Sequence, residues 1–314
     1  MRTCRSRRCI EVLVAGVDGG GTKTEGVILN EAGEVVACAR SGGVNLNFVS
    51  LEECERSVAE VFSQLASAVD REQVVRIYSV MLADIPSLRS YIQQAFPHAE
   101  WRGAHEHRAV LAAGGVLEPY GIGVVAGTGS STVGWRDEHR HASVGGWGML
   151  LGDEGSATDI AIQALRAVVR AVDGRGESTI LREEMVDYFG LKHPWDITRR
   201  VYRDNLPRHV LAGFAVRVSH AADAGDRVAQ RILREAGETL GNDVLVVARK
   251  LFTPEEAFPV VLGGGVFRAG EWVIAPLRER VLAEYPKAQV ILPNVSPAVG
   301  LARLALKDIT IHSL

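Results

Sequence analysis

The chain has 314 residues, of which 47% are hydrophobic and 23% are charged, a composition typical of soluble globular proteins. This length exceeds what one simple core usually holds and predicts two domains of ordinary size. The net charge of -3 offers no basic excess to a phosphate backbone, which argues against nucleic acid as a partner. No apolar run reaches membrane-spanning length, so we expect no membrane partner either.

The start of the chain is basic, and the apolar stretch behind it is interrupted by Glu11. Without a small-residue cleavage site, this start is not expected to be an export signal. The four cysteines, Cys4, Cys9, Cys38 and Cys54, lie close together in sequence, whereas a disulfide framework would spread across the fold. Cys4 and Cys9 lack the second pair of ligands that a zinc site requires. We therefore expect a reduced, cytoplasmic protein.

Hydrophobic patterning predicts a meander of three strands over Val12–Val17, Gly26–Asn30 and Glu34–Arg40. After it we expect, in chain order, a helix over 51–68, a strand over 74–82 and a helix over 87–95. A second meander of the same kind is predicted over residues 121–126, 132–135 and 141–144. Because the opening pattern occurs twice, the sequence indicates an internal duplication.

The rest of the chain is predicted to be mostly helical. Helices are expected over 154–172, 177–188, 207–221 and 226–251, strands over 258–262 and 289–292, and a last helix from Ala298. Alternating strands and helices favour an α/β architecture, here built from two duplicated halves.

The first turn of the opening meander, Asp18–Thr24, holds three consecutive glycines followed by threonine and lysine. Glycines allow positive φ and close approach of a ligand, and successive N–H groups form a nest for an anion. A carboxylate beside such a nest would repel phosphate unless a divalent cation lies between them, so Asp18 is a candidate Mg²⁺ holder, through water. A plain glycine-rich hairpin is the alternative, although such a turn needs only one or two glycines. The segment is not a P-loop, since a strand rather than a helix is predicted after it.

Two further glycine-rich turns follow predicted strands. Residues 127–132 occupy the matching place in the second meander and suggest a phosphate chain gripped from two sides. Residues 263–265 are three glycines in a row, which would let a flat adenine or ribose lie against the backbone. The loose dinucleotide fingerprint at 121–126 lies within a predicted strand, so we attribute it to chance.

Four segments, taken together, resemble the N-acetylglucosamine kinase group of the BadF/BadG/BcrA/BcrD-type ATPase family, in the actin/hexokinase/Hsp70 superfamily. They are GVDGGGTKTEGVIL, VVAGTGSSTVGW, GGWGMLLGDEGSA and VVLGGGV, and the match runs in order from Val12 to Leu304. The resemblance implies two duplicated ribonuclease-H-like (actin-like ATPase) domains with a central cleft. The N-terminal domain would cover 10–115 together with a returning C-terminal helix at 297–314, and the C-terminal domain would cover 116–296.

The resemblance also implies site residues. Contacts with ATP would come from three loops: Gly20, Gly21, Thr22 and Lys23; Thr128, Gly129 and Ser130; and Gly263, Gly264 and Gly265. Contacts with the sugar would come from Asn45, Gly146, Trp147 and Asp153. A carboxylate suits two sugar hydroxyls and an amide suits mixed donors and acceptors. The alternative for Asp153 or Ser156 is that it caps the helix predicted from about residue 154.

Phosphoryl transfer needs a carboxylate that orients or deprotonates the attacking hydroxyl. The family places an Asp at the start of a helix, and this chain has Glu106 there, so Glu106 and Asp18 are the predicted catalytic residues. Glutamate is one methylene longer, and a misplacement of about 1 Å can cost on the order of a hundredfold in rate. Residues 79–84 also depart from the glycine-rich turn of the family. A metal site at His105 and His107 is not expected, because two residues two positions apart on a helix diverge.

The resemblance therefore implies an ATP-dependent, Mg²⁺-assisted kinase of an amino sugar, N-acetylglucosamine or glucosamine, with N-acetylmuramic acid and glucose also open. An ATP- and sugar-binding sensor with weakened catalysis is the first alternative, motivated by Glu106. An ATPase activator of a reductase would need cysteines for an iron–sulfur cluster, and none follows Cys54. A repressor would need an added helix-turn-helix domain, for which we see no room. A homodimer is a family expectation.

Overall fold

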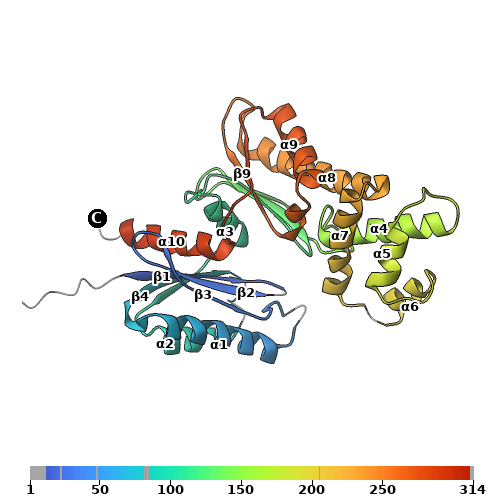
Figure 1. Ribbon diagram of the computed structural model, residues 1–314. Coiled ribbons are helices and arrows are strands. Elements are labelled where there is room, and N and C mark those ends of the chain that lie inside the picture. The colour runs from blue at the N-terminus through green and yellow to red at the C-terminus, as the bar shows by residue number, and fades with distance from the viewer. Residues whose placement is uncertain are drawn as a thin grey trace, which may run out of the picture. The chain divides into compact units, whose positions relative to one another are not determined.

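The computed structural model describes residues 12–21, 23–46, 49–80, 82, 85–204 and 206–311. The chain divides into two compact units (Figure 1). Unit 1 comprises residues 1–117 and 294–314, and unit 2 comprises residues 118–293. The predicted positions Cys4, Cys9, Thr22 and Asp84 lie outside the described residues.

Unit 1 contains a mixed five-stranded sheet. Its elements are β1 (Leu13–Gly19), β2 (Thr24–Leu29), β3 (Val35–Ser41), α1 (Leu51–Ala68), β4 (Val74–Val80), α2 (Leu88–Ala95), β5 (Glu100–Gly103), α3 (Glu106–Ala113) and α10 (Pro297–Ile311). The strand order is β3-β2-β1-β4-β5, with an antiparallel β1–β2–β3 meander and with β4 parallel to β1 and β5 parallel to β4. The carboxyl ends of β1 and β4 therefore meet at one edge of the sheet.

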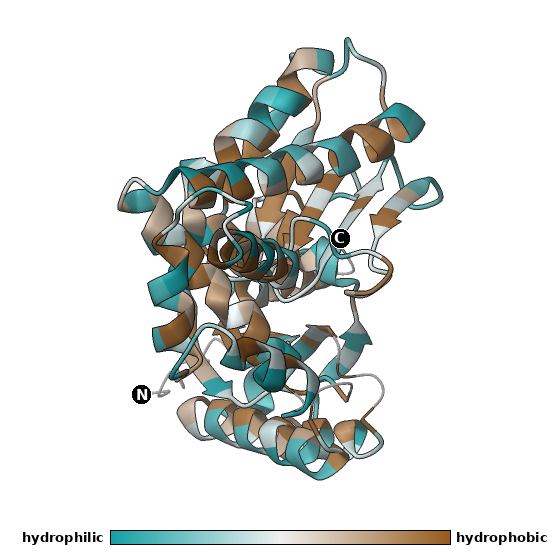
Figure 2. Ribbon diagram, turned by 90° about the vertical axis from the view of Figure 1, so that its right-hand side faces the viewer, coloured by the Kyte–Doolittle hydropathy of each residue, from teal (hydrophilic) through white to brown (hydrophobic). Residues whose placement is uncertain are grey.

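Helices cover both faces of this sheet. Figure 1 shows α1 and α2 on one face and α10 on the other. The side of α1 that carries Val61, Phe62 and Leu65 is buried against the sheet, and a capping box of Ser50 and Glu53 fixes where that helix begins. Figure 2 shows teal and brown residues alternating along the surface helices, as expected when each helix buries one side.

Gly16 allows α10 to lie directly on β1. A Cβ atom at this position would lie 2.1 Å from the carbonyl oxygen of Ala298 and 2.4 Å from the amide nitrogen of Ala302. Both obstacles are backbone atoms, so neither can rotate out of the way. The glycine in the middle of the strand is therefore required by close packing of the helix.

The substitution Gly16→Ala is expected to lower the free energy of unfolding by at least about 2 kcal/mol, because the added methyl group overpacks a rigid backbone contact. Denaturant unfolding of the purified protein would measure this loss. Gly103→Ala is the matched control in the same unit, since a Cβ atom there meets nothing within 4 Å. Equal stability of the two variants would contradict the packing argument.

Unit 2 repeats the sheet of unit 1. Its elements are β6 (Gly121–Ala126), β7 (Ser130–Trp135), β8 (His141–Gly145), α4 (Ala157–Val172), α5 (Leu181–Tyr188), α6 (Asp196–Tyr202), α7 (Arg208–Asp223), α8 (Arg227–Leu251), β9 (Pro259–Gly263), α9 (Glu271–Glu284) and β10 (Gln289–Ile291). The strand order β10-β9-β6-β7-β8 is the order of unit 1 read from the other edge, with the same antiparallel meander and the same parallel additions. The predicted α/β fold of two duplicated halves is confirmed.

The core of unit 2 joins buried residues of its sheet to buried residues of α4, α5, α6, α7, α8 and α9, and the long helix α8 contacts the sheet. Gly134 in β7 lets α8 approach the sheet, because a Cβ atom there would lie 2.7 Å from Cγ1 of Val247. Gly237 on α8 likewise allows α9 to pack closely, because a Cβ atom at Gly237 would lie 2.2 Å from the carbonyl oxygen of Val273. Among the described residues, no helix is both long and apolar enough to span a bilayer.

Candidate active site

The turn between β1 and β2 is held from two sides. The amide of Gly20 donates to the carbonyl oxygen of Lys23 (2.8 Å), and the amide of Val44 donates to the carbonyl oxygen of Gly20 (2.9 Å). Asn45, a predicted sugar ligand, follows Val44 directly and is half-buried. Gly21 lies at the bend of the turn. The structure therefore brings Asn45 beside the predicted phosphate loop of the same unit.

Lys23 is engaged by a buried carboxylate on the next strand. Its Nζ lies 3.1 Å from Oε2 of Glu25, whose side chain also lies 3.5 Å from the guanidinium of Arg40. Burial acts to raise the pKa of Glu25, but hydrogen bonding and these positive charges outweigh it and lower that pKa. Glu25 thus remains ionised and holds the ammonium group of Lys23 close to the turn.

Two carboxyl groups, Asp18 and Glu106, occupy the edge of the sheet in unit 1 where β1 and β4 end. Asp18 pairs in register with Val80 near the ends of these strands, and Glu106 is the first residue of α3. Burial raises the pKa of Asp18 to about 6, with the charge of Lys23 opposing and that of Glu25 adding to the rise. Burial, reinforced by the negative charge of Asp18, raises the pKa of Glu106 to about 7. The charge of Asp18 therefore acts on Glu106.

The donor set at this edge suits a hard cation. No side chain or amide among the described residues donates a hydrogen bond to either carboxylate. Buried carboxylates without donors are costly unless a cation or a substrate proton compensates them. Among the described residues, no group of three His, Cys, Asp or Glu side chains is arranged for a metal. One or two carboxylates are nevertheless enough for Mg²⁺, which takes its other ligands from water and substrate phosphates.

The helix that carries Glu106 begins with a local cap. The Nδ1 atom of His105 accepts a hydrogen bond from the amide of His107 (3.3 Å), which fixes the first turn of α3. Gly300 on α10 lets α3 pack closely, since a Cβ atom there would lie 2.3 Å from the carbonyl oxygen of Ala109. Glu106 is thus presented by a helix end that is anchored at both its cap and its packing face.

The loop between β6 and β7 carries the second predicted phosphate site. The amide of Gly127 donates to the carbonyl oxygen of Gly129 (2.8 Å), and the first amide of α4, from Ala157, donates to the carbonyl oxygen of Gly127 (2.9 Å). The hydroxyl of Ser130 donates to the carbonyl oxygen of Glu154 (2.8 Å). The loop is therefore attached to the segment that leads into α4.

Asp153, a predicted sugar ligand, faces this loop. Only 4% of the residue is exposed, and its φ of 62° is the only positive value of a non-glycine residue among those described. Its Oδ1 accepts from the amide of Ser130 (3.3 Å), and its Oδ2 forms an ion pair with Arg208. The cap of α4 is Ser156, whose hydroxyl accepts from the amide of Asp159 (3.2 Å). Non-glycine residues with a positive φ concentrate at ligand sites, so the backbone of Asp153 makes this residue a candidate ligand contact.

The segment between β8 and Asp153 is rich in glycine and projects apolar side chains. Gly146 has a φ of 78° and its amide donates to the carbonyl oxygen of Ser130 (3.0 Å). Trp147 is 75% exposed, and Leu150 and Leu151 are exposed to a similar degree. The predicted sugar residues Gly146 and Trp147 therefore adjoin the loop at 127–130 through a backbone contact.

The third predicted loop, 263–265, lies at the same edge of the sheet as 127–130, because β6 and β9 are parallel neighbours. Gly264 has a φ of 105°, and a Cβ atom there would lie 2.3 Å from the carbonyl oxygen of Ala126. A Cβ atom at Gly265 would meet nothing within 4 Å. The backbone of this loop is thus pressed against the end of β6 on one side and open on the other.

Sequence reasoning missed two residues that hold these loops. Arg208, the first residue of α7, contacts both Asp153 and Thr128. Thr158 is fully buried, and its hydroxyl donates to the carbonyl oxygen of Thr128 at 2.5 Å. Neither belongs to a glycine-rich segment or to a hydrophobic period, so no local signal could have identified them.

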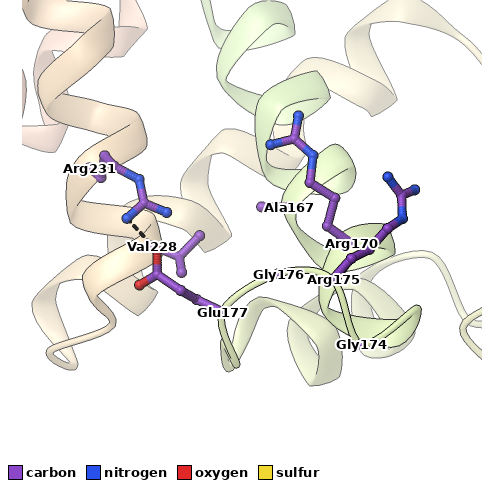
Figure 3. Close-up of a pocket in the computed structure, with 8 residues that line it drawn as sticks. All are labelled: Ala167, Arg170, Gly174, Arg175, Gly176, Glu177, Val228 and Arg231. Atoms are coloured by element: carbon purple, nitrogen blue, oxygen red, sulfur yellow. Dashed lines mark hydrogen bonds and ion pairs between the residues drawn. The ribbon is translucent and has the colours of Figure 1, made fainter.

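A separate cavity of about 620 Å³ lies in unit 2 between the end of α4 and the start of α8 (Figure 3). Its lining includes three arginines, and it consists of Ala167, Arg170, Gly174, Arg175, Gly176, Glu177, Val228 and Arg231. Arg231 is paired with Glu177 (2.7 Å), and Arg175 is paired with Asp173 (2.8 Å). None of the predicted site residues lines this cavity.

Comparison with known proteins identifies relatives along nearly the whole chain. The model of the BadF/BadG/BcrA/BcrD ATPase family matches residues 15–305. An N-acetylmuramic acid/N-acetylglucosamine kinase of Clostridium acetobutylicum is 30% identical over 302 residues, covering 94% of this chain and 98% of the relative. An N-acetyl-D-glucosamine kinase of Dictyostelium discoideum is 27% identical, covering 93% of this chain and 97% of the relative.

Solved structures show the same fold. A Chromobacterium violaceum protein, provisionally named an N-acetylglucosamine kinase, superposes with a TM-score of 0.66 at 24% identity, covering 94% of this chain and 99% of the other. A ROK family glucokinase from Streptomyces griseus, solved with glucose and AMPPNP, superposes with a TM-score of 0.58 at 19% identity, covering 93% of this chain and 98% of the other.

Proposed function

Because the chain belongs to the BadF/BadG/BcrA/BcrD ATPase family, we propose that it is an ATP-dependent sugar kinase whose acceptor is an amino sugar, N-acetylglucosamine or glucosamine. The observation that supports this most is the pair of carboxyl groups, Asp18 and Glu106, beside the glycine turn of unit 1. Phosphoryl transfer requires charge neutralisation and an oriented hydroxyl, and two carboxylates with different roles can provide both.

Glu106 is the proposed general base. Its pKa of about 7 lies near neutral pH, where a base is most effective in removing a proton from a hydroxyl during transfer. Its carboxylate would accept the proton of the attacking sugar hydroxyl as that oxygen bonds to the γ-phosphorus of ATP, while the bond from this phosphorus to the bridging oxygen breaks and ADP leaves. Because its position at the start of α3 is fixed by the His105 cap, the side chain needs little reorganisation.

Asp18 is the proposed holder of Mg²⁺, directly or through water. The ion, when bound, would neutralise charge on the phosphates of ATP. Asp18 presents a carboxylate that no hydrogen-bond donor among the described residues contacts, and the ion pair with Glu25 keeps Lys23 near it. The cation would also offset the charge of Asp18, which adds to the effect of burial in raising the pKa of Glu106.

ATP contacts are proposed for the glycine turn of unit 1, including Thr22, and for the two loops of unit 2. In unit 2, Thr128, Gly129 and Ser130 would offer backbone amides and hydroxyls to the phosphates. The open side of Gly263, Gly264 and Gly265 would receive the nucleoside, because no side chain stands between the backbone and a flat ring.

The substitution Gly264→Ala is expected to raise the KM for ATP about tenfold, because the new methyl group would push the loop away from Ala126 and strain a left-handed residue. Steady-state kinetics with varied ATP would measure this. Gly121→Ala is the matched control: its φ is 116° and its Cβ atom would lie 2.6 Å from Cγ of Pro259, at the opposite end of β6. An unchanged KM in the first variant, or an equal rise in both, would count against a nucleoside site here.

The sugar is proposed to contact Asn45, Gly146, Trp147 and Asp153. The carboxylate of Asp153 already accepts from Ser130 and Arg208, so its remaining lone pairs are those available for sugar hydroxyls. The exposed ring of Trp147 offers an apolar face, which suits the apolar side of a sugar or its acyl group.

A coupled ADP-release assay with Mg-ATP tests this function against N-acetylglucosamine, glucosamine, N-acetylmuramic acid and glucose. Turnover that depends on an amino sugar and exceeds turnover with glucose is the expected result. Tight ATP binding without turnover on any of these sugars would instead favour a sensor of the same fold, in which the longer side chain of Glu106 does not support transfer.

A further inference from the structure

Arg208 stands at the start of α7, directly after Pro207, and its side chain is largely buried, with 21% of its surface exposed. The guanidinium forms an ion pair with Oδ2 of Asp153 and donates to the carbonyl oxygen of Thr128 (3.2 Å) through the same terminal nitrogen. Its Nε lies 3.5 Å from the hydroxyl oxygen of Thr158 on α4, the helix that packs beside α7 in Figure 1.

These contacts link two separate loops through one side chain. Thr128 belongs to the proposed phosphate loop, and Asp153 belongs to the proposed sugar segment. The link is tight, because a Cβ atom at Gly129 would lie 2.9 Å from Oδ2 of Asp153 and 3.1 Å from the terminal nitrogen of Arg208. The ion pair therefore packs directly on the backbone of the phosphate loop.

The arrangement depends on Arg208 for its charge balance. Asp153 is 4% exposed, and apart from the arginine its carboxylate accepts only the amide of Ser130 among the described donors. A carboxylate buried with one neutral donor is strongly disfavoured, whereas an Arg–carboxylate pair with further hydrogen bonds is stable. Without the cation, Asp153 would not hold its left-handed backbone against the loop.

We propose that Arg208 is a positioning residue that couples the phosphate loop at 127–130 to the sugar segment at 146–156, so that ordering one loop orders the other. This inference rests on the proposed kinase function. When phosphates order the loop, the carbonyl of Thr128 and the ion pair with Asp153 are fixed with it, and Asp153 is then presented to the sugar. Binding of nucleotide would thus favour binding of sugar, and the reverse, by the same factor.

The test uses hydrogen exchange of the full chain with and without Mg-ADP, which does not depend on the identity of the sugar. In the unmodified protein, Mg-ADP is expected to slow exchange in both segments, at 146–156 by about fivefold or more. In Arg208→Gln, Mg-ADP should still slow exchange at 127–130 but no longer at 146–156. Arg208→Lys, which keeps the charge but not the fork of donors, should retain part of the effect.

Arg217→Gln is the matched control, because Arg217 lies on the same helix and pairs at the surface with Glu184 (2.9 Å) and Asp187 (3.0 Å). It should leave protection of both segments unchanged. In the kinase assay, Arg208→Gln should raise the KM for sugar and for ATP, and saturation with one substrate should no longer lower the KM for the other.

Each other outcome overturns a stated idea. Slower exchange at 127–130 alone in the unmodified protein, or protection of both segments in Arg208→Gln, would overturn the coupling but leave the kinase proposal standing. Protection of neither segment in the unmodified protein would overturn the proposed nucleotide site and the coupling with it. Exchange could also rise across all of unit 2 in both Arg208→Gln and Arg208→Lys while Mg-ADP still protects both segments. That result would show that Arg208 only stabilises the core of unit 2.

Discussion

Replacing Glu106 with Gln is expected to lower sugar-dependent turnover by a factor of about 10² to 10⁴, because the amide cannot accept the proton of the attacking hydroxyl. Glu106→Ala should lose as much. Glu106→Asp should keep measurable turnover, since a carboxylate remains. The coupled ADP-release assay measures these rates, and nucleotide affinity measured in parallel should change little in any of the three variants.

The pH dependence gives an independent check on the same residue. A base must be ionised, so kcat/KM should fall as the pH drops through the pKa of Glu106, which burial and Asp18 raise to about 7. Mg²⁺ at Asp18 would remove the negative charge beside it, so the acid limb of kcat should lie at lower pH than that of kcat/KM. Persistence of this limb in the residual activity of Glu106→Gln would refute the role of base, because the amide of that variant cannot titrate.

Replacing Asp18 with Asn is expected to abolish most Mg²⁺-dependent turnover and, at the same time, to stabilise the protein free of ligand. The folded-state pKa of Asp18 is raised to about 6, so the folded chain binds a proton more readily than the unfolded chain between about pH 4 and 6. Stability therefore falls as pH rises through this window. At pH 8 the buried charge costs up to about 3 kcal/mol, taking about 1.4 kcal/mol for each unit of pKa.

Denaturant unfolding without nucleotide would measure this effect. Asp18→Asn should exceed the unmodified protein in stability at pH 8, and the difference should shrink toward zero at pH 4. Adding Mg-ATP should narrow the gap at pH 8 by stabilising only the unmodified protein. If Asp18→Asn is less stable than the unmodified protein at pH 8, the carboxylate of Asp18 makes favourable contacts within the protein and does not need a cation to compensate its charge.

Much of the fold was predictable because the residues of each meander themselves show the pattern of strands and turns. Short buried strands that end at glycine-rich turns are visible in the sequence, and the confirmed duplication follows from finding that pattern twice. Three elements were not predicted: β5 has only four residues, α6 is short, and α9 contains Pro276 with its buried residues spread around the helix. In each case the element is stabilised by what packs on it rather than by its own pattern.

From the residues alone, the candidate site was predictable only where glycine marks it, whereas Asn45, Glu106 and Asp153 were named through the family resemblance. The loops that contain Gly20, Gly129 and Gly264 were found because a loop that approaches a ligand needs glycine. The pairing of Arg208 with Asp153 joins residues 55 positions apart in sequence, and that of Asp18 with Glu106 depends on how β1 and α3 are brought together. Such partners become visible only when the chain is folded, because nothing in either local sequence specifies the other.

The return of α10 to the first sheet has a consequence for how the chain matures on the ribosome. Unit 2 is one continuous stretch, residues 118–293, so it can form as soon as it has left the ribosome. Unit 1 cannot, because the strand face that carries Val14, Val27 and Leu29 is covered by Ala298, Ala302 and Ala305, which are synthesised after unit 2. Unit 1 is therefore begun before unit 2 and completed after it, and its apolar strand face stays uncovered until α10 has been synthesised.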